Sequence, residues 1–195
     1  MALGRPLQFD PDVAVDAAMQ LFWRKGYEST SLRDLLAAMD LSKSSFYQAF
    51  ESKDALFLRC LEHYEATGAG QMREDLRQAE SGWAFLGNWL SAAAHDMRGR
   101  DGRRGCMLVN TAGEFGQSDT RIASQVSTNF AAVAEILTRA IRMAQREGEV
   151  PKNKDPATLA TYLISSMSGL RTLVKSGADR KTVQTVATIV RNSLV

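Results

Sequence analysis

The sequence is short of cysteine, histidine and proline, and each shortage narrows the class of protein. Its two cysteines, Cys60 and Cys106, do not suggest the disulfide framework of a small secreted domain. Its two histidines, His63 and His95, leave few candidates for a general base or a metal ligand. Only four prolines occur in the chain, so long helices can form without interruption.

Long apolar runs are also missing. The opening residues MALGRPLQFD hold no apolar stretch of signal-peptide length, and no later segment approaches the ~18 apolar residues of a membrane-spanning helix. The chain has 195 residues and 45% hydrophobic content, enough to bury a core without disulfides. We therefore expect one or two globular domains in the cytoplasm.

Motifs for catalysis are absent as well. The sequence has no nucleophile elbow and no glycine-rich phosphate loop. Cys60 and His63 share a helix face, but no second pair of metal ligands accompanies them. His95 and Asp96 are neighbours on one predicted helix, where adjacent side chains diverge. We expect no enzyme, no metal site and no cofactor.

The spacing of the apolar residues predicts an all-α fold. Even the β-branched residues mostly follow helical rather than alternating spacing. Gly26 is suited to end the first helix, and Asp34 stands where a capping box needs a carboxylate for the second. The expected N-caps of the first four helices are Asp10, Ser31, Ser42 and Ser52.

The second and third helices are short and joined by a tight turn, which is the pattern of a helix-turn-helix unit. Residues 40–56, DLSKSSFYQAFESKDAL, contain the third helix, which such a unit places in the major groove of DNA. At about 100° per residue, Phe46 and Phe50 face the core, whereas Ser44, Tyr47 and Gln48 face outward. Hydroxyls and lysines suit phosphate oxygens, and Gln48 suits an adenine edge.

Net charge does not mark this region as DNA-binding. Residues 1–65 hold seven basic and ten acidic side chains, although the whole chain has a net charge of +2. A broad positive surface is therefore absent. The N-termini of the third and fourth helices carry partial positive charge that attracts phosphate instead. The alternative is that the serines only cap helices and the aromatic rings only pack, with nothing bound.

Residues 9–58 resemble the N-terminal domain of TetR-family transcriptional regulators. The matching stretches are Lys25-Gly26-Tyr27, residues 30–34 (TSLRD), residues 42–50 (SKSSFYQAF) and residues 52–56 (SKDAL). The resemblance implies a three-helix helix-turn-helix domain, residues 1–52, followed by a helical domain, residues 53–195, that binds an effector and dimerises. It also implies a repressor that a small molecule releases from its double-stranded DNA operator.

Carried over by position, the resemblance assigns DNA contacts to nine residues. Phosphate contacts fall to Ser31, Ser42, Tyr47 and Lys53, and base-edge contacts to Lys43, Ser44, Ser45, Gln48 and Arg33. Ser44 and Asp40 stand where the family often has glycine. Because aspartate tolerates left-handed geometry, the fold is unaffected, but the DNA sequence that the third helix reads stays open. Arg5 could reach a minor groove as an N-terminal arm, although such tails are more often disordered.

The last two helices of the chain carry apolar stripes and small residues. We expect them to form a four-helix interface with a second copy, through Leu163, Leu170, Val183, Val186 and Val190. A twofold dimer also fits DNA half-sites spaced one helical turn apart. The alternative is that these stripes only close the core of a single protomer.

Aromatic and methionine side chains of the second half are candidates for an effector cavity, although such residues are more often plain core. The candidates are Trp83, Trp89, Met107, Phe115 and Phe130.

Cys106 follows Arg103 and Arg104 near an expected helix N-terminus, and both features favour a thiolate. Together with Lys175-Ser176-Gly177, its surroundings resemble a TetR branch of electrophile-sensing repressors. Thiol-based redox sensing is thus an alternative to release by a small molecule, and a small buried hydrophobe is the plainer interpretation of Cys106. A helical protein-interaction module without DNA binding is a further alternative.

Overall fold

The computed structural model of the protein describes residues 9–95, 97, 102–116 and 118–195. Over these ranges it contains nine α-helices and no strand, which confirms the all-α fold. The helices are α1 (Pro11–Lys25), α2 (Leu32–Met39), α3 (Lys43–Phe50), α4 (Lys53–Gln78), α5 (Gly82–His95), α6 (Met107–Phe115), α7 (Thr120–Glu147), α8 (Pro156–Lys175) and α9 (Arg180–Asn192).

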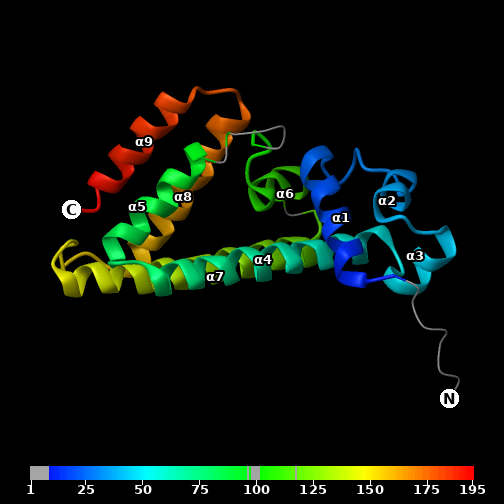
Figure 1. The fold of residues 1–195 in the computed structure, drawn as a ribbon, viewed down its shortest axis with the longest axis horizontal. Helices are drawn as coiled ribbons and strands as arrows, with labels where there is room; N and C mark the ends of the chain where they lie inside the picture. The colour runs from blue at the N-terminus through cyan, green and yellow to red at the C-terminus, as the bar shows by residue number, and fades with distance from the viewer. Residues whose placement is uncertain (1–8, 96, 98–101, 117) are drawn as a thin grey trace, which may run out of the picture.

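The two longest helices, α4 and α7, lie side by side along the length of an elongated molecule (Figure 1). α1, α2 and α3 gather at one end of this pair, and α5, α8 and α9 at the other (Figure 1). α4 has 26 residues and α7 has 28. At about 1.5 Å per residue, each helix is roughly 40 Å long and connects the two ends.

The first four helices begin at the N-caps that the sequence predicts. Each cap side chain accepts a backbone N–H from its first turn, at 2.9 Å for Asp10 and 3.1 Å for Ser31, Ser42 and Ser52. Asp34 accepts in return from the backbone N–H of Ser31, which completes the predicted capping box. Local hydrogen bonds therefore fix where α2, α3 and α4 start.

A residue with positive φ stands in the turn before α3 and another directly after it. Asp40, after α2, has φ 51° and ψ 46°, the left-handed geometry expected for an aspartate at this turn. Glu51, after α3, also has a positive φ of 62°, which is uncommon for a residue with a long side chain. No residue pattern indicates the second turn, which sets α3 against the start of α4.

One hydrophobic core holds α1, α2 and α3 against the first half of α4. Phe46 and Phe50 of α3 are 0% and 2% exposed and pack in it with Phe22 and Phe57. The same cluster continues into α6 and α7 through Met107, Leu108, Ile122 and Val126. The helix-turn-helix end is therefore packed directly on helices of the second half.

A second core lies between α5, α7, α8 and α9, and it corrects part of the expected dimer interface. Leu163, Leu170, Val183 and Val190 belong to this core, with between 0% and 7% of their surface exposed in the single protomer. Side chains with so little exposed surface offer a partner almost no contact area, so these four are core residues of the protomer. Val186 is half-buried against the same cluster.

Candidate DNA-binding face and effector cavity

The outward face of α3 carries the polar side chains that the sequence predicts. Lys43, Ser44, Tyr47 and Gln48 are exposed, Tyr47 to 47%, while Ser45 is half-buried. The remaining predicted DNA contacts lie on α2 and at the starts of α2, α3 and α4: Ser31, Arg33, Ser42 and Lys53. Arg5 lies outside the described residues.

Three serine hydroxyls form a cluster at the start of α3. The Ser42 oxygen lies 2.9 Å from the hydroxyl oxygens of both Ser44 and Ser45. It also accepts the backbone N–H of Ser45 at 3.1 Å. Each hydroxyl has one proton to donate, and the two contacts use two of the three. One proton is left to donate to a group outside the protein, such as a phosphate oxygen.

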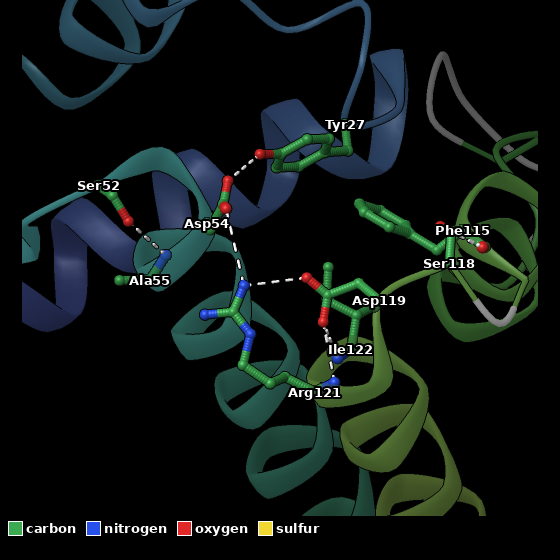
Figure 2. Close-up of polar contacts among 9 residues, drawn as sticks. All are labelled: Tyr27, Ser52, Asp54, Ala55, Phe115, Ser118, Asp119, Arg121 and Ile122. Atoms are coloured by element: carbon green, nitrogen blue, oxygen red, sulfur yellow. Dashed lines mark hydrogen bonds and ion pairs between the residues drawn. The ribbon is translucent and has the colours of Figure 1, made fainter.

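Lys53, in the first turn of α4, rests on an aromatic ring. Its Nζ lies 4.0 Å from the centroid of the Tyr27 ring, and the Tyr27 hydroxyl donates to Asp54 (Figure 2). Burial, followed by the hydrogen bond to Asp54, raises the pKa of Tyr27 well above its ordinary value. The phenol therefore stays protonated as a donor, and its ring limits the positions that the Lys53 ammonium can take.

Charged side chains connect the first turn of α4, at Asp54, to the start of α7 (Figure 2). Nη2 of Arg121 lies 3.0 Å from Asp119 and 3.8 Å from Asp54. Hydrogen bonds from Arg121 and from backbone N–H groups of the helix start lower the pKa of Asp119. Since Arg121 and Asp54 are at least half exposed, each ion pair adds little stability, but together they connect α4 to α7.

Glu114 of α6 holds the loop between α1 and α2. Its two carboxylate oxygens accept the backbone N–H of Tyr27 at 2.9 Å and of Glu28 at 2.7 Å. At the other end of α6, the indole of Trp23 donates to the carbonyl of Gly105 at 3.2 Å. α6 is thus bonded at both ends to the helix-turn-helix end. No pattern near Glu114 in the sequence signals this role, because its partners lie 87 and 86 positions away.

A cavity of about 320 Å³ lies between α4, α5, α7 and α8 and the start of α6. Of the predicted cavity residues, Trp89 and Phe130 line it. The other three pack elsewhere, which corrects their predicted position. The Trp83 ring is covered by the guanidinium of Arg191 at 4.4 Å, Met107 is a 2% exposed core residue, and Phe115 packs on the ring of Tyr27 at 5.0 Å.

Cys106 is half-buried at the N-cap position of α6 and lines the same cavity. Its sulfur lies 3.8 Å from the hydroxyl oxygen of Tyr64. Arg104 is engaged with α1: its guanidinium lies 3.6 Å from the centroid of Trp23. Cys60, by contrast, is buried in the core, and burial raises the pKa of its thiol.

The outer face of α8 and α9 carries apolar side chains among small hydroxyl residues. Tyr162, Leu173 and Ile189 are 39%, 38% and 62% exposed. Hydroxyls of both helices donate to backbone carbonyls one turn earlier: those of Thr161, Ser166, Thr172, Thr185 and Thr188. Covering this face would therefore leave few polar groups without a partner.

The described residues also lack a membrane-spanning helix and a cluster of metal ligands. Among the described residues, no helix is both long and apolar enough to cross a membrane. Within the same ranges, no group of three or more His, Cys, Asp and Glu side chains could hold a metal ion.

A short helix with an exposed polar face, set in a helix-turn-helix unit, defines a DNA-binding protein of the helix-turn-helix class. The family model for bacterial regulatory proteins of the tetR family matches residues 14–60. The model for the tetracyclin repressor-like C-terminal domain matches residues 82–190. The chain belongs to the TetR family of helix-turn-helix transcriptional regulators.

Similar proteins that are named as transcriptional regulators support the assignment to this family. The chain is 30% identical to the HTH-type transcriptional repressor ComR of Escherichia coli (strain K12), over 94% of this chain and 88% of ComR. The structure of a cysteine mutant of the TetR family regulator CifR, in complex with 26-bp operator DNA, has a TM-score of 0.85 and 27% identity. It covers 98% of this chain and 100% of that one. Reduced E. coli NemR has the same fold, with a TM-score of 0.85, 19% identity and coverage of 93% and 94%.

Proposed function

We propose that this protein is a cytoplasmic, homodimeric repressor that binds operator DNA through α3 and releases it when a small molecule enters the cavity. In this proposal residues 1–52 form the DNA-binding domain, and residues 53–195 bind the effector and dimerise. The observation that carries the proposal is the two-sided α3, with Phe46 and Phe50 in the core and Tyr47 and Gln48 exposed. Among the described residues, the contacts of that outer face are made within α3 and its cap: the Tyr47 ring packs on Phe46, and the Ser44 hydroxyl contacts Ser42. Its polar groups therefore remain available to phosphate oxygens and base edges.

The nine predicted DNA contacts divide by chemistry. Phosphate oxygens would accept from Ser31, Ser42, Tyr47 and Lys53. Base edges would be read by Lys43, Ser44 and Gln48, together with Arg33 and Ser45. Capping leaves donors for these contacts, because Ser31 accepts from its own helix and keeps its proton, and the cluster of Ser42, Ser44 and Ser45 keeps one proton in all.

The dimer would form through the outer face of α8 and α9, in the face-to-face packing of a four-helix bundle. Tyr162, Leu173 and Ile189 supply exposed apolar area. The exposed part of the half-buried Val186 side chain adds to it. The proposal therefore keeps the predicted helices but replaces the buried residues with the side chains on their outer surface.

In this proposal α6 transmits ligand binding in the cavity to the DNA-binding end of the molecule. Its start, at Cys106, lines the cavity, and its end holds the α1–α2 loop through Glu114. A ligand that shifts the start of a short rigid helix also shifts its end, and with it the helix-turn-helix unit. The ligand then favours the shape that fits DNA less well.

A second candidate is a thiol sensor, in which an oxidant or electrophile modifies Cys106. Its support is that Cys106 lines the cavity instead of lying fully in the core. Reaction of the native dimer with a thiol probe, followed by peptide mapping, tests this candidate. Labelling of Cys106 is expected, with Cys60 as the buried internal control. An unlabelled Cys106 would eliminate the thiol sensor.

The repressor itself is tested by fluorescence anisotropy on duplexes from the region upstream of its own gene, with scrambled duplexes as controls. We expect preference for the native duplex and a steep loss of affinity between two salt concentrations, since phosphate contacts release counterions. Equal binding to both duplexes, with no salt dependence, would contradict sequence-specific DNA recognition in that region.

A further inference from the structure

We propose that the effector is a small uncharged molecule with an apolar body and one hydrogen-bond-accepting oxygen, and that the hydroxyl of Tyr64 donates to that oxygen. The proposal rests on the proposed function, because it names the ligand class for the cavity of that repressor.

The cavity walls fit an apolar body. Trp89 of α5 and Phe130 of α7 supply aromatic faces, and Met72, Ile164 and Met167 supply adaptable aliphatic surface. The volume of about 320 Å³ is small for a ligand site. Ligand sites of roughly 300–1,000 Å³ are usual. At about 30 Å³ per water molecule, this cavity has the volume of about ten waters, which accommodates a bicyclic ring system of about a dozen non-hydrogen atoms.

Most polar side chains in the wall are already bonded within the protein. Asn129 donates to the carbonyl of Leu61 at 2.9 Å, and Gln71 donates to Asp75 at 2.7 Å. Ser168 donates to a backbone carbonyl one turn earlier at 2.8 Å. A ligand with several polar groups would bury them here without partners, which costs free energy. The wall therefore selects a ligand with few polar atoms.

Tyr64 is the exception, because the side-chain partner of its hydroxyl is a weak one. That partner is the sulfur of Cys106, 3.8 Å away, and either group can donate in this contact. Burial raises the pKa of Tyr64, and the neighbouring Cys106 raises it further, so the phenol remains a donor. A carbonyl or ether oxygen would exchange the weak contact to sulfur for a full O–H···O hydrogen bond. This end of the cavity therefore recognises one ligand oxygen.

The charges of the wall favour a neutral ligand over an anion. Arg171 lies near enough to Tyr64 to lower its pKa, and its positive field suits the negative end of a carbonyl dipole. Arg171 is already engaged in an interaction within the protein. Glu65 and Asp75 add two carboxylates to the same wall. A ligand carboxylate would lose its hydration next to them, which a neutral oxygen avoids.

Three probes of nearly equal shape test the ligand class: 2-acetylnaphthalene, 2-naphthoate and 2-isopropylnaphthalene. The first has a neutral acceptor, the second an anion and the third no acceptor. Binding to the full-length protein is measured by calorimetry and thermal shift in one cosolvent. We expect 2-acetylnaphthalene to bind roughly 2- to 10-fold more tightly than 2-isopropylnaphthalene, the value of one hydrogen bond, and 2-naphthoate to bind most weakly.

Tyr64→Phe removes the hydroxyl and keeps the ring. In this variant the preference for 2-acetylnaphthalene over 2-isopropylnaphthalene should disappear, while 2-isopropylnaphthalene binds as before. Tyr47→Phe makes the same chemical change on α3, outside the cavity, and should keep the preference. Retention of the preference in Tyr64→Phe would overturn the role of Tyr64.

A pair of glycine variants tests the location. Gly68 and Gly70 both lie on α4, and a Cβ at either would meet no atom within 4 Å, but only Gly68 lines the cavity. Gly68→Leu should abolish binding of 2-acetylnaphthalene, whereas Gly70→Leu should bind it like the wild type. Both substitutions should raise the melting temperature, because leucine has a higher helix propensity than glycine. That increase would establish that each variant is folded.

The outcomes separate this proposal from the proposed function. Tighter binding of 2-naphthoate than of 2-acetylnaphthalene would overturn the neutral class and make Arg171 the determinant. Absence of binding by all three probes, in a protein that still binds its operator in anisotropy, would overturn the ligand class and leave the repressor standing. Absence of operator binding would instead contradict the repressor, whatever the probes do.

Discussion

The most informative single substitution is Glu114→Gln, because it alters the link between α6 and the DNA-binding end without changing the shape of the side chain. The carboxylate accepts two backbone N–H groups, at 2.9 Å and 2.7 Å. An amide presents one oxygen and one N–H₂ group, so one of the two N–H donors must face another donor. Hydrogen bonds to charged groups contribute roughly 1.5–3 kcal/mol when protected, and this site is exposed, so about 1 kcal/mol is a fair value for the lost bond.

Glu114→Gln should also weaken binding of the operator DNA. If the loop is less firmly held in the free protein, DNA binding must restore its order, and about 1 kcal/mol corresponds to roughly a 5-fold weaker affinity. Urea unfolding measures the first effect, and anisotropy on the operator duplex measures the second. Glu135→Gln is the matched control, since it makes the same chemical change at an exposed position of another helix, α7. If the two variants behave alike in both assays, the reasoning about Glu114 is refuted.

Further outcomes concern recognition, assembly and pH. Tyr47→Ala should weaken binding to all duplexes by roughly 1–2 kcal/mol, whereas Gln48→Ala should change the preferred sequence, which competition between duplexes distinguishes. Ile189→Asp should shift the dimer toward monomer in sedimentation, whereas Val13→Asp should not, although the two side chains are similarly exposed, at 62% and 66%. Hydrogen bonds with Ser31 lower the pKa of Asp34 from 3.8 to about 2, so its stabilising effect is complete above about pH 4 and is lost as the pH falls toward 2. The difference in unfolding free energy between wild type and Asp34→Asn should therefore shrink over that range, and a constant difference would contradict it.

The helix starts could be predicted from the sequence because their signals are local. Ser31 and Asp34 are three residues apart and bond each other's backbone, so neighbouring residues alone determine where α2 begins. The orientation of α3 follows for the same reason, because Phe46 and Phe50 lie one turn apart and both are buried.

The faces of the later helices could not be predicted in this way. α8 is apolar on two sides, so spacing alone does not distinguish buried Leu163 from exposed Tyr162. Trp83 and Trp89 lie on one helix, and only the packing of other helices decides which of them lines the cavity. Glu114 contacts a loop 87 positions away, and no pattern near it in the sequence signals that contact.

Cys106→Ser distinguishes two causes of a shift of α6: occupation of the cavity by a small molecule and chemical modification of the Cys106 thiol. The substitution removes the nucleophilic sulfur at the start of α6 and leaves a serine, which is a favourable N-cap. If a small molecule acts by occupying the cavity, the variant should still be released from its operator by 2-acetylnaphthalene and should no longer respond to N-ethylmaleimide. Operator release by N-ethylmaleimide in the variant would mean that another group reacts, because Cys60 is buried and its thiol pKa is raised. Loss of both responses would instead place the sulfur itself in the ligand contact, since both signals leave the cavity through the start of α6.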